Sequence, residues 1–435
     1  MYDGYKSLMI CNSLCASVAK SIMIPVKEAR DIVLSQVPIL GTEKVDLFSA
    51  LGRVLAENIA APYNVPPHDN SAMDGYAVRT EDVRNASRDL PVVLDVLEDL
   101  PAGYVSQHRL EARQAIRIMT GASIPEGANA VIRVEDTERA EGNRVRIFKA
   151  VPPRYDIRVA GEDIRKGEVI LQKGTVFRPA EVGLLASLGK SFAQVYQRVQ
   201  VAILATGDEL VEPDEPLQPG KIINSNSYAL AALVLETGAI PIQLGIARDS
   251  QADLEAKFSA GLRADMMISS GGVSVGDYDL VKDILNQSGA AMEFWQVCMK
   301  PGKPLAFGSI SGKPTFGLPG NPVSSMVSYE IFVRPALLKM MGHARIYRAV
   351  ISATMEEELK KTDARKHFMR VTLHQENGKY LASTTGAQGS GILSSMAKAN
   401  GLAVIDEARM VVKAGEEVPV MMLDQSFGMS NDRDF

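Results

Sequence analysis

The sequence contains little cysteine, histidine or tryptophan. Among its 435 residues there are only 3 cysteines, 5 histidines and 1 tryptophan. Cys11, Cys15 and Cys298 fit neither a disulfide framework nor a four-ligand zinc site, so we expect reduced thiols in a cytosolic protein. No serine, histidine and acid pattern and no cysteine nucleophile motif stands out. No apolar run approaches the roughly 20 residues of a membrane span, so we expect no membrane partner.

An excess of basic charge is also absent. The formal net charge is -5 and the pI is about 5.7. These values argue against a surface that coats a polyanion, so nucleic acid is not expected as a partner and any basic site must be local. Residues 1–22 carry a short apolar stretch broken by Cys, Asn and Ser, which favours a disordered tail or a misassigned start over a signal peptide.

Several kinds of local pattern follow one another along the chain. Residues 26–60 have the pattern of a helix, a short strand and a second helix that Gly52 interrupts. Short alternating apolar runs from Tyr76 to about Val151, split by Gly and Pro, predict a small β-rich domain. Hairpin-like strands and a helix from Pro179 come next, and the last segment, from about Arg345, predicts a small β-barrel-like or sandwich domain.

Between these parts the pattern is an alternation of strands and helices. From Val199 onward, apolar strands such as "VQVAILAT" alternate with helices such as "SNSYALAALVLETGA". This alternation predicts right-handed βαβ units around a mostly parallel sheet, with ligands at the carboxyl ends of the strands. We therefore predict four parts after residues 1–22, namely 23–62 with 152–197, 63–151, 198–344 and 345–435.

Two segments of the αβ part suit an anion. After "TFGLPG", Asn321 and Pro322 are typical of a helix start, and Ser324 and Ser325 follow in the first turn, where free amides favour an anion. A well-capped helix without a ligand explains the same residues equally well. The nearby "KPGKP" adds Lys300 and Lys303 as point charges for phosphates, although lone lysines are usually solvated surface groups.

Acidic residues follow the same strands. Asp208 and Glu209 end one strand and Asp249 ends the next, while Asp277 and Asp279 follow a third in "SSGGVSVGDYD". Parallel strands deliver their carboxyl ends to one rim, where carboxylates beside an anion suit Mg²⁺. Helix capping is the alternative for Asp277 and Asp279. The segments "DNSAMDGYAVR", "IMTGASIPEG" and "AGEDI" are further candidates, each of which is a turn if taken singly.

Taken together, these segments resemble the MoeA family of molybdopterin molybdenumtransferases, which is similar to one domain of gephyrin. The resemblance rests on "DNSAMDGYAVR", "RIMTGASIPEGANAVI", "AGEDI", "ATGDEL", "SSGGVSVGDYD", "KPGKP", "GLPGNPVSS" and "TTGAQGSGILSSM", which cover nearly the whole chain from Met23 in family order. It implies an α/β multidomain fold with a central, MogA-like αβ domain of three layers and a parallel-rich sheet, small β-rich domains and a C-terminal barrel-like domain.

The resemblance also implies an activity. The family inserts molybdate into adenylylated molybdopterin in an Mg-dependent step that releases AMP, and its members are cytoplasmic homodimers whose cleft is shared between subunits. Molybdopterin adenylyltransferase and other proteins of the cofactor pathway are the partners it implies. Molybdate and tungstate have nearly the same size and charge, so the motifs suit either oxyanion.

The family's functional positions are carried over motif by motif. The catalytic positions implied are Asp74, Thr120, Asp163, Glu209, Asp249, Asp279, Lys300 and Lys303, with Glu209 and Asp279 as metal ligands. The substrate-binding positions implied are Ser269, Ser270, Gly271, Gly272, Pro319, Gly320, Asn321, Pro322, Ser324, Arg370 and Ser390. Two departures are Gln296, where some members have lysine, and Val159, where arginine is common, so we expect a weaker anion pocket.

Two alternatives of different kinds stay open on the sequence. An adenylyltransferase that makes the adenylylated pterin shares the "SSGG" and "PGNP" loops, but the extra β domains and "DNSAMDGYAVR" favour the insertion step. A non-catalytic scaffold is the second alternative, against which the full set of acidic and lysine motifs weighs.

Overall fold

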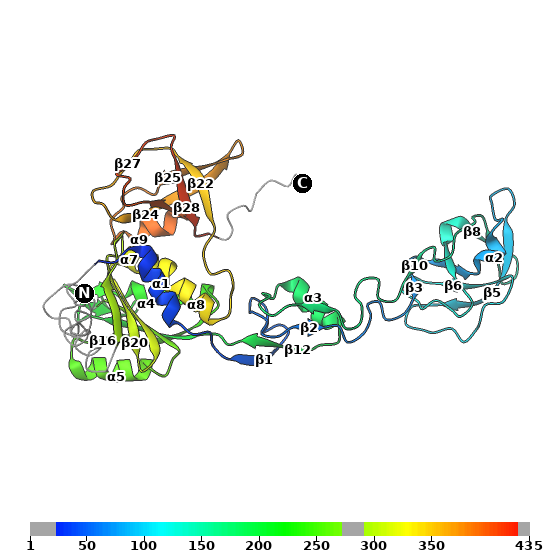
Figure 1. The fold of residues 1–435 in the computed structure, drawn as a ribbon, viewed down its shortest axis with the longest axis horizontal. Coiled ribbons are helices and arrows are strands. Elements are labelled where there is room, and N and C mark those ends of the chain that lie inside the picture. Colours follow the sequence, from blue (N-terminus) through cyan, green and yellow to red (C-terminus); the bar gives the residue numbers. More distant parts are fainter. Residues whose placement is uncertain (1–22, 272–290, 425–435) are drawn as a thin grey trace, which may run out of the picture. The chain divides into compact units, whose positions relative to one another are not determined.

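The computed structural model describes residues 23–271 and 291–424. They form two compact units, which are coloured along the chain in Figure 1. The first unit contains the described residues up to 44, residues 52–54 and those from 194 onward, and the second contains 45–51 and 55–193. No helix among the described residues is long and apolar enough to cross a membrane.

A six-stranded sheet is the centre of the first unit. Its strands are, in spatial order, β16 (Ile240–Ala247), β13 (Gln200–Thr206), β17 (Met266–Ser270), β21 (Lys313–Leu318), β20 (Pro304–Ile310) and β18 (Ala291–Gln296). The first four strands are parallel to one another, and β20 and β18 are antiparallel additions at one side. The sheet is thus parallel-rich, as predicted, and the carboxyl ends of β13, β17 and β21 meet at one rim.

Helices cover both faces of this sheet, and its strands are apolar on both. Val201 and Ile203 of β13 pack into a core with α1 (Val26–Gln36), α4 (Ser225–Glu236) and the helices that follow β21. Ala202 and Leu204, which point the other way, pack against α5 (Gln251–Gly261). Burial on both faces explains why these strands are nearly continuous apolar runs without alternation. This arrangement confirms the three-layer αβ prediction.

The helix after β21 is continuous but not uniform. It consists of α7 (Pro322–Ser328), a π-helical turn at Tyr329–Val333 and α8 (Arg334–Met340). The residues of the π turn are all buried. Asn321 precedes the first turn, but its side chain makes no capping hydrogen bond, so the amide group is available for another partner.

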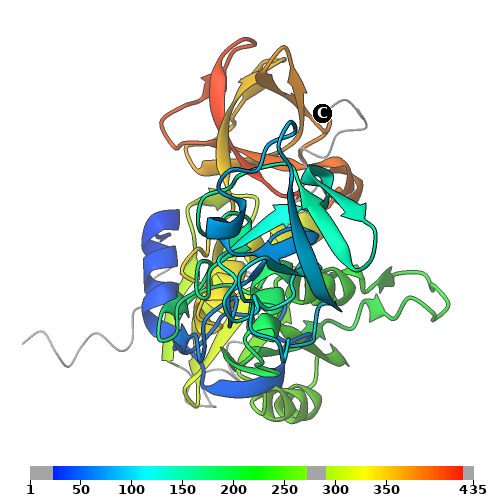
Figure 2. The same ribbon diagram turned by 90° about the vertical axis from the view of Figure 1, so that its right-hand side faces the viewer.

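The C-terminal part of the first unit is a closed β-barrel. Its strands are β22 (Val350–Met355), β24 (Lys366–Glu376), β25 (Lys379–Thr384), β26 (Gly401–Ile405) and β28 (Glu417–Met422), and β24 pairs with both β25 and β26 to close it. The helix α9 (Leu393–Lys398) and the short strands β23 (Leu359–Lys360) and β27 (Val411–Val412) flank the barrel. In Figures 1 and 2 the barrel, orange to red, lies against one end of the αβ domain. The predicted C-terminal barrel is therefore confirmed.

The second unit is rich in β-structure. Its main sheet contains, in spatial order, β7 (Ala130–Arg133), β4 (Gly75–Val78), β6 (Gln114–Ile118), β5 (Val92–Leu100), β9 (Arg144–Ile147) and β8 (Thr137–Ala140), with helix α2 (Thr80–Val83) and a 3-10 turn at Val134–Asp136 beside it. Two small sheets pair β2 (Ile59–Ala60) with β11 (Val169–Leu171) and β3 (Asn70–Ser71) with β10 (Ile157–Arg158). The helix α3 (Pro179–Ser187) begins at the predicted proline.

The helix predicted to end near residue 60 does not form. The chain forms β1 (Thr42–Asp46), which pairs with β12 (Phe192–Tyr196), and then a series of turns. The Asp46 carboxylate accepts hydrogen bonds from the amides of Phe48 and Ser49, each at 3.0 Å, and Gly52 has a φ of +76°. The local hydrogen bonds of an aspartate compete with helix formation, which explains why the apolar pattern misled the prediction.

Candidate functional site

A cleft of about 750 Å³ lies within the first unit, between the αβ domain and the C-terminal barrel. Its lining includes Lys300, Lys303, Pro319, Asn321, Ser324, Lys360, Arg365, His367, Arg370, Gln388 and Ser390. Seven of these are sequence-predicted site residues, namely Lys300, Lys303, Pro319, Asn321, Ser324, Arg370 and Ser390. The structure therefore gathers residues from four separate motifs around one opening.

The lysines of "KPGKP" are attached to the barrel by a short strand. The strand β19 (Met299–Lys300) pairs in parallel with the start of β24, which places Lys300 opposite His367. The Lys300 ammonium donates a hydrogen bond to Thr362 Oγ1 at 3.0 Å and lies 3.6 Å from the Asp363 carboxylate. Lys303 has no acidic partner among the described residues. One cation of this turn is thus fixed in place and the other remains available.

Arg370 is the most deeply buried cation of the cleft. It is only 1% exposed, and its guanidinium donates Nε to Ser395 Oγ at 3.0 Å and Nη2 to the carbonyl of Gly389 at 3.0 Å. These partners are neutral, and among the described residues no carboxylate lies against it. Burial lowers the pKa of Arg370, because water that would stabilise the charge is excluded. A buried cation without a counter-charge is costly unless an anion binds beside it.

The helix start beside Arg370 is joined directly to the barrel. The amide of Val323 donates to the carbonyl of Ser390 at 3.1 Å, and Pro322 occupies the first helical turn. Ser324 is 4% exposed and faces the same opening as Asn321. The anion interpretation of this segment gains support, because the free Asn321 amide and the cations meet in one cleft.

An acid and its cations at the cleft edge are functional candidates that the sequence reasoning missed. Asp363 accepts a bidentate pair from Arg365, at 2.9 Å to Nε and 2.8 Å to Nη2, and a contact from His367 Nε2 at 3.1 Å. The Arg365 hydrogen bonds are the main cause that holds the pKa of Asp363 far below its usual range. The sequence feature that could have pointed to these residues is the charge-rich run "TDARKH", which leads into the strand that carries Arg370.

Two of the predicted rim carboxylates converge. The Asp208 amide donates to the Asp249 carboxylate at 3.3 Å, and the Asp249 amide donates back to Asp208 at 3.2 Å. Glu209 is exposed beside them. Among the described residues no group of three or more His, Cys, Asp or Glu side chains could hold a metal ion. Asp277 and Asp279 lie outside the described residues, so the metal prediction for Asp279 stays a prediction.

The described start of the glycine loop, at the end of β17, makes close contacts. Ser269 and Ser270 are buried, and Asn226 donates its amide to Ser270 Oγ and to the Gly320 carbonyl, both at 2.8 Å. Gly271 has a φ of +91°, and an added Cβ would lie 2.9 Å from the Thr206 carbonyl oxygen, so only glycine fits. Asn226, at the start of α4, was not predicted. Gly272 lies outside the described residues.

In the second unit, three predicted segments come together. The Asp74 carboxylate accepts from the Thr120 amide and hydroxyl, both at 2.7 Å, and these bonds lower the pKa of Asp74. The amide of Ala160, in "AGEDI", donates to Asp69 Oδ1 at 2.8 Å, and Gly121 donates to the Ser71 carbonyl at 2.8 Å. Asp163 is exposed beside this group. Taken singly each segment is a turn, but together they form a polar cluster.

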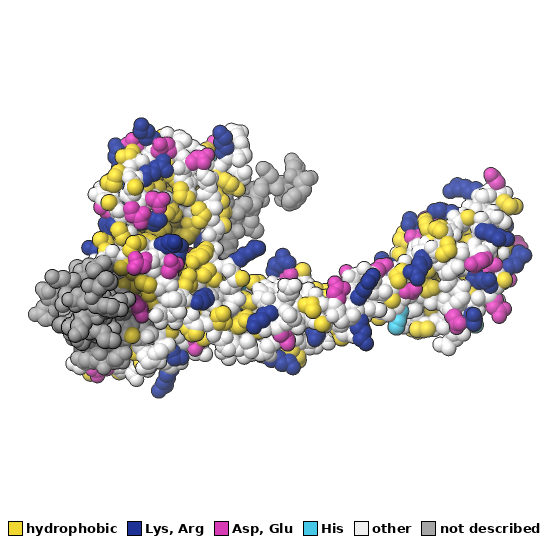
Figure 3. Space-filling model, viewed as in Figure 1, with side chains coloured by type: hydrophobic (Ala, Val, Ile, Leu, Met, Phe, Trp, Pro, Cys, Tyr) yellow, Lys and Arg dark blue, Asp and Glu magenta, His cyan; other side chains and the backbone are white. Residues whose placement is uncertain are grey.

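The two positions that depart from the family pattern, Gln296 and Val159, lie in different surroundings. Gln296 is 8% exposed in β18 and does not line the cleft, whereas the amide of Val159 donates to the Glu162 carboxylate at 2.9 Å. Charge is otherwise distributed evenly over the visible surface, since acidic and basic side chains are interspersed on the face that Figure 3 shows. The cleft is therefore a local basic site on an acidic protein, as the composition requires.

Comparisons with known proteins cover nearly the whole chain. Residues 24–189 match the MoeA N-terminal region (domain I and II), residues 202–339 match a probable molybdopterin binding domain, and residues 352–423 match the MoeA C-terminal region (domain IV). The cleft is thus lined by residues of the second and third matches.

Full-length relatives agree with these matches. The chain is 40% identical over 411 residues to a molybdopterin molybdenumtransferase of Nostoc sp., covering 92% of this chain and 94% of the relative. It is 38% identical over 410 residues to a molybdopterin molybdenumtransferase of Haemophilus influenzae, covering 93% and 100%. A solved structure, the molybdopterin biosynthesis MoeA protein of Pyrococcus horikosii, matches with a TM-score of 0.81 at 33% identity and covers 93% of this chain and 100% of that one.

Proposed function

The chain belongs to the MoeA family, and on that premise we propose that it inserts molybdate into adenylylated molybdopterin and releases AMP. This is a transferase reaction of molybdenum cofactor biosynthesis. The adenylyltransferase and scaffold alternatives are not favoured, because the matches extend beyond the molybdopterin-binding domain over nearly all of a named transferase.

The observation that carries this proposal is the chemistry of the cleft. Both substrates are anions, and the cleft offers the buried guanidinium of Arg370 together with the ammonium of Lys303, neither of which has an acidic partner among the described residues. Protein acceptors hold Nε and Nη2 of Arg370, so its charge and its Nη1 donor are what it offers to an oxyanion, and Lys303 acts as a point charge. Lys300, which Thr362 and Asp363 hold, extends the positive field along the same wall.

We assign polar contacts to the remaining lining residues. Asn321 and Ser324 supply neutral donors at the helix start, and Ser390 supplies another from the barrel loop. Donors that are fixed before the substrate arrives stabilise developing negative charge without reorganisation, which is how such a site lowers the barrier. Ser269, Ser270 and Gly271 leave room for the pterin or nucleotide at the adjoining rim.

Mg²⁺ is the cation that we propose for the rim. The carboxylates of Asp208, Glu209 and Asp249 lie at the ends of β13 and β16, and Mg²⁺ usually takes one or two protein carboxylates and fills its other positions with water and phosphate oxygens. These residues do not form a three-ligand group among the described residues, so we propose one or two of them as ligands, with Asp279 as a further predicted ligand. When bound, the ion would neutralise charge on the phosphates of the adenylate.

The remaining features of the proposal concern assembly and location. We propose a homodimer in which the polar cluster of Asp74, Thr120 and Asp163 serves the cleft of the other subunit, as the family resemblance implies. We also propose a cytoplasmic protein that receives its substrate from a molybdopterin adenylyltransferase. Separate site clusters in the two units support the first of these proposals.

The test is a reconstituted reaction. The purified protein is incubated with adenylylated molybdopterin, Mg²⁺ and molybdate, and AMP and metallated cofactor are measured. Formation of both products is the expected result. If instead neither appears and the protein converts ATP and free molybdopterin to the adenylate, the adenylyltransferase assignment replaces the one proposed. Omission of Mg²⁺ tests the metal separately and is expected to stop AMP release.

A further inference from the structure

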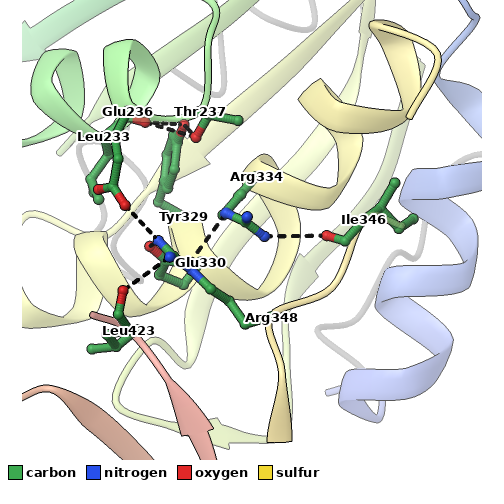
Figure 4. Close-up of polar contacts among 9 residues, drawn as sticks. All are labelled: Leu233, Glu236, Thr237, Tyr329, Glu330, Arg334, Ile346, Arg348 and Leu423. Carbon is green, nitrogen blue, oxygen red and sulfur yellow. Dashed lines mark hydrogen bonds and ion pairs between the residues drawn. The ribbon is translucent and has the colours of Figure 1, made fainter. Parts of the chain in front are cut away.

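A second buried ionic group lies in the first unit, away from the cleft lining. Figure 4 shows that it is centred on Glu330, in the π turn, and Arg348, in the segment of residues 342–349 between α8 and β22. Arg348 donates Nε to Oε2 and Nη2 to Oε1 of Glu330, each at 3.0 Å. The two side chains are 8% and 2% exposed, so this bidentate pair is almost completely removed from water.

Arg348 uses its remaining donors to join other elements. Its Nη1 donates to the carbonyl of Leu423 at 2.9 Å, just beyond β28, and its Nη2 also reaches Glu236 Oε1 at 3.1 Å at the end of α4. One guanidinium therefore connects the joining segment, the π turn, α4 and the last strand of the barrel. A lysine could not form this set of contacts, because its single nitrogen lacks the planar fork.

Two other arginines hold the same joining segment. Arg334 donates Nη1 to the carbonyl of Ile346 at 3.3 Å, and the guanidinium of Arg30, in α1, lies 4.7 Å above the Tyr347 ring. The barrel is attached there too, since the Met422 amide donates to the Ala349 carbonyl at 2.9 Å. The segment that links the two domains is thus fastened at successive residues.

The charges of this buried group are balanced, which favours a role in fixing the positions of the joined elements. Two acids, Glu330 and Glu236, balance two bases, Arg334 and Arg348. Burial opposes the charge on Arg348, but the hydrogen bonds and charges of Glu330 and Glu236 outweigh it and raise its pKa. Replacing a buried ion pair with apolar side chains is often neutral or stabilising, so such a pair is a poor source of stability, whereas its fixed directions specify a geometry.

The group is close to both walls of the cleft. Ser324 lines the cleft in the first turn of the helix that carries Glu330 six residues later, about 9 Å along the axis at the usual rise per residue. On the barrel side, Arg370 of β24 is paired with Leu402 of β26, which is paired with Met421 of β28. Leu423, whose carbonyl accepts from Arg348, follows Met421 two residues later, so one strand, β26, separates β28 from the strand that carries Arg370.

We propose that Glu330 and Arg348 are positioning residues for the transferase reaction. They fix the barrel against the αβ domain and so set the distance between Arg370 on one wall of the cleft and Ser324 and Lys303 on the other. The kinetic consequence of this inference rests on the function proposed above, whereas the consequence for domain geometry does not.

The kinetic test compares two arginines of the same segment. Arg348→Met removes the bidentate pair with Glu330, and Arg345→Met is the matched control, because Arg345 is an exposed arginine of the same segment. We expect Arg348→Met to lower kcat/KM about 10- to 100-fold, mainly by raising the KM for molybdate, since small displacements of positioned groups have effects of this size. A merely structural loss would reduce the amount of folded enzyme and lower the apparent kcat at an unchanged KM. A lower apparent kcat at an unchanged KM would therefore overturn the proposal.

A double variant separates positioning from folding. Glu330→Met with Arg348→Met leaves no unpaired buried charge at this pair, so it is expected to melt near the wild-type temperature even where the single variant unfolds. It still lacks the link to Leu423, so we expect its KM to stay raised. A double variant with both the wild-type melting temperature and the wild-type KM would show that the pair is not needed to position the cleft, and would overturn the proposal.

Domain geometry is measured without any substrate. In a protein whose three native cysteines are replaced by serine, spin labels are attached at Ser259→Cys on α5 and Lys379→Cys on β25, both exposed. If the Glu330–Arg348 pair fixes the two domains, the distance between the two labels has one narrow distribution. We expect the double variant to broaden or shift this distribution and Arg345→Met to leave it unchanged. An unchanged distribution in the double variant refutes the inference. If the wild-type protein makes no AMP, the function proposed above fails, and this distance alone decides the positioning claim.

Discussion

Replacement of Arg370 tests the anion cleft most directly. Arg370 is 1% exposed, its Nε and Nη2 are satisfied by neutral acceptors, and its Nη1 has no protein partner among the described residues. Arg370→Met removes the charge and the fork but preserves a long apolar side chain. Arg370→Lys keeps a charge and loses the fork. We expect both variants to bind molybdate and phosphate more weakly, with the methionine variant weaker than the lysine variant.

The size of the effect follows from the contact that would be lost. A hydrogen bond to a charged group contributes about 1.5–3 kcal/mol, which corresponds to about a 10- to 150-fold loss of oxyanion affinity. The folded state is expected to change much less. The bonds to Ser395 and the carbonyls are also donated by the charged guanidinium and contribute about 1.5–3 kcal/mol each, but removal of a buried charge without a counter-charge offsets most of their sum, so we expect a net change within about 2 kcal/mol.

The assay is thermal unfolding with and without oxyanion. A ligand at about 100 times its Kd stabilises the folded state by about 2.7 kcal/mol, so the wild-type melting temperature should rise with molybdate or phosphate. The Arg370→Met melting temperature should be almost unchanged by the same additions. Lys360→Met is the matched control, because Lys360 also lines the cleft but is already paired with Glu358 at 2.5 Å.

Two results would refute this reasoning. If Arg370→Met loses several kcal/mol of unfolding free energy without added ligand, the guanidinium is a structural group whose neutral partners suffice. If the variant keeps the wild-type response to molybdate while it stays folded, the oxyanion binds elsewhere. If only the Lys360→Met variant lost the rise in melting temperature with oxyanion, the anion would bind near Lys360 and not at Arg370.

Two further predictions concern turns and pH. Gly302→Ala is expected to lower the unfolding free energy in urea by about 1–3 kcal/mol more than Gly312→Ala does. Both glycines have positive φ, but only the new Cβ at Gly302 would meet another atom, Ser328 Oγ, at 2.7 Å. Equal costs would show that the Ser328 side chain moves away at no cost. The hydrogen bonds and charge of Arg178 lower the pKa of Glu181 to about 2, so the Glu181 carboxylate contributes stability that is complete above its unfolded pKa of about 4.5 and is lost as the pH falls toward 2. Glu181→Gln is expected to lower the unfolding free energy by about 1–2 kcal/mol at pH 7, a modest amount because solvent screens the exposed Arg178. Below about pH 2 the variant should be as stable as the wild type. A difference in stability that persists at low pH would contradict the ionic explanation.

The sequence predicted the elements whose signals are local. The alternation of apolar strands and helices was sufficient for the αβ sheet, and short strands separated by turns were sufficient for the barrel. The helix predicted after β1 failed because Asp46 makes its own hydrogen bonds to the following amides, a competition that apolar periodicity does not reveal. The π turn at Tyr329–Val333 was also missed, because its residues are as apolar as those of a regular helix.

The cleft gathers motif residues of both the αβ domain and the barrel, whereas the acid beside them, Asp363, was missed. Lys300, Asn321 and Ser390 were found as members of motifs, and the structure brings them together. Arg365 and His367, the local partners of Asp363, are only two and four residues away, but its contact with Lys300 arises only when β19 pairs with β24 and brings the acid beside the "KPGKP" turn. A charge-rich segment before a strand is usually a solvated surface, so composition alone could not distinguish it.

Two arginines of the first unit show what only the structure can separate. Arg348 and Arg370 are both largely buried, and the sequence distinguishes them only through the family motif that contains Arg370, not through the groups that meet each side chain. Arg348 is met by Glu330 and Glu236, which together raise its pKa, whereas burial lowers the pKa of Arg370 and no acid compensates it. A buried charge with its own counter-charge is compensated within the fold, whereas one without it is a candidate for binding an anion. We therefore propose different roles for the two arginines, with Arg348 positioning the walls of the cleft and Arg370 binding the anion that enters it.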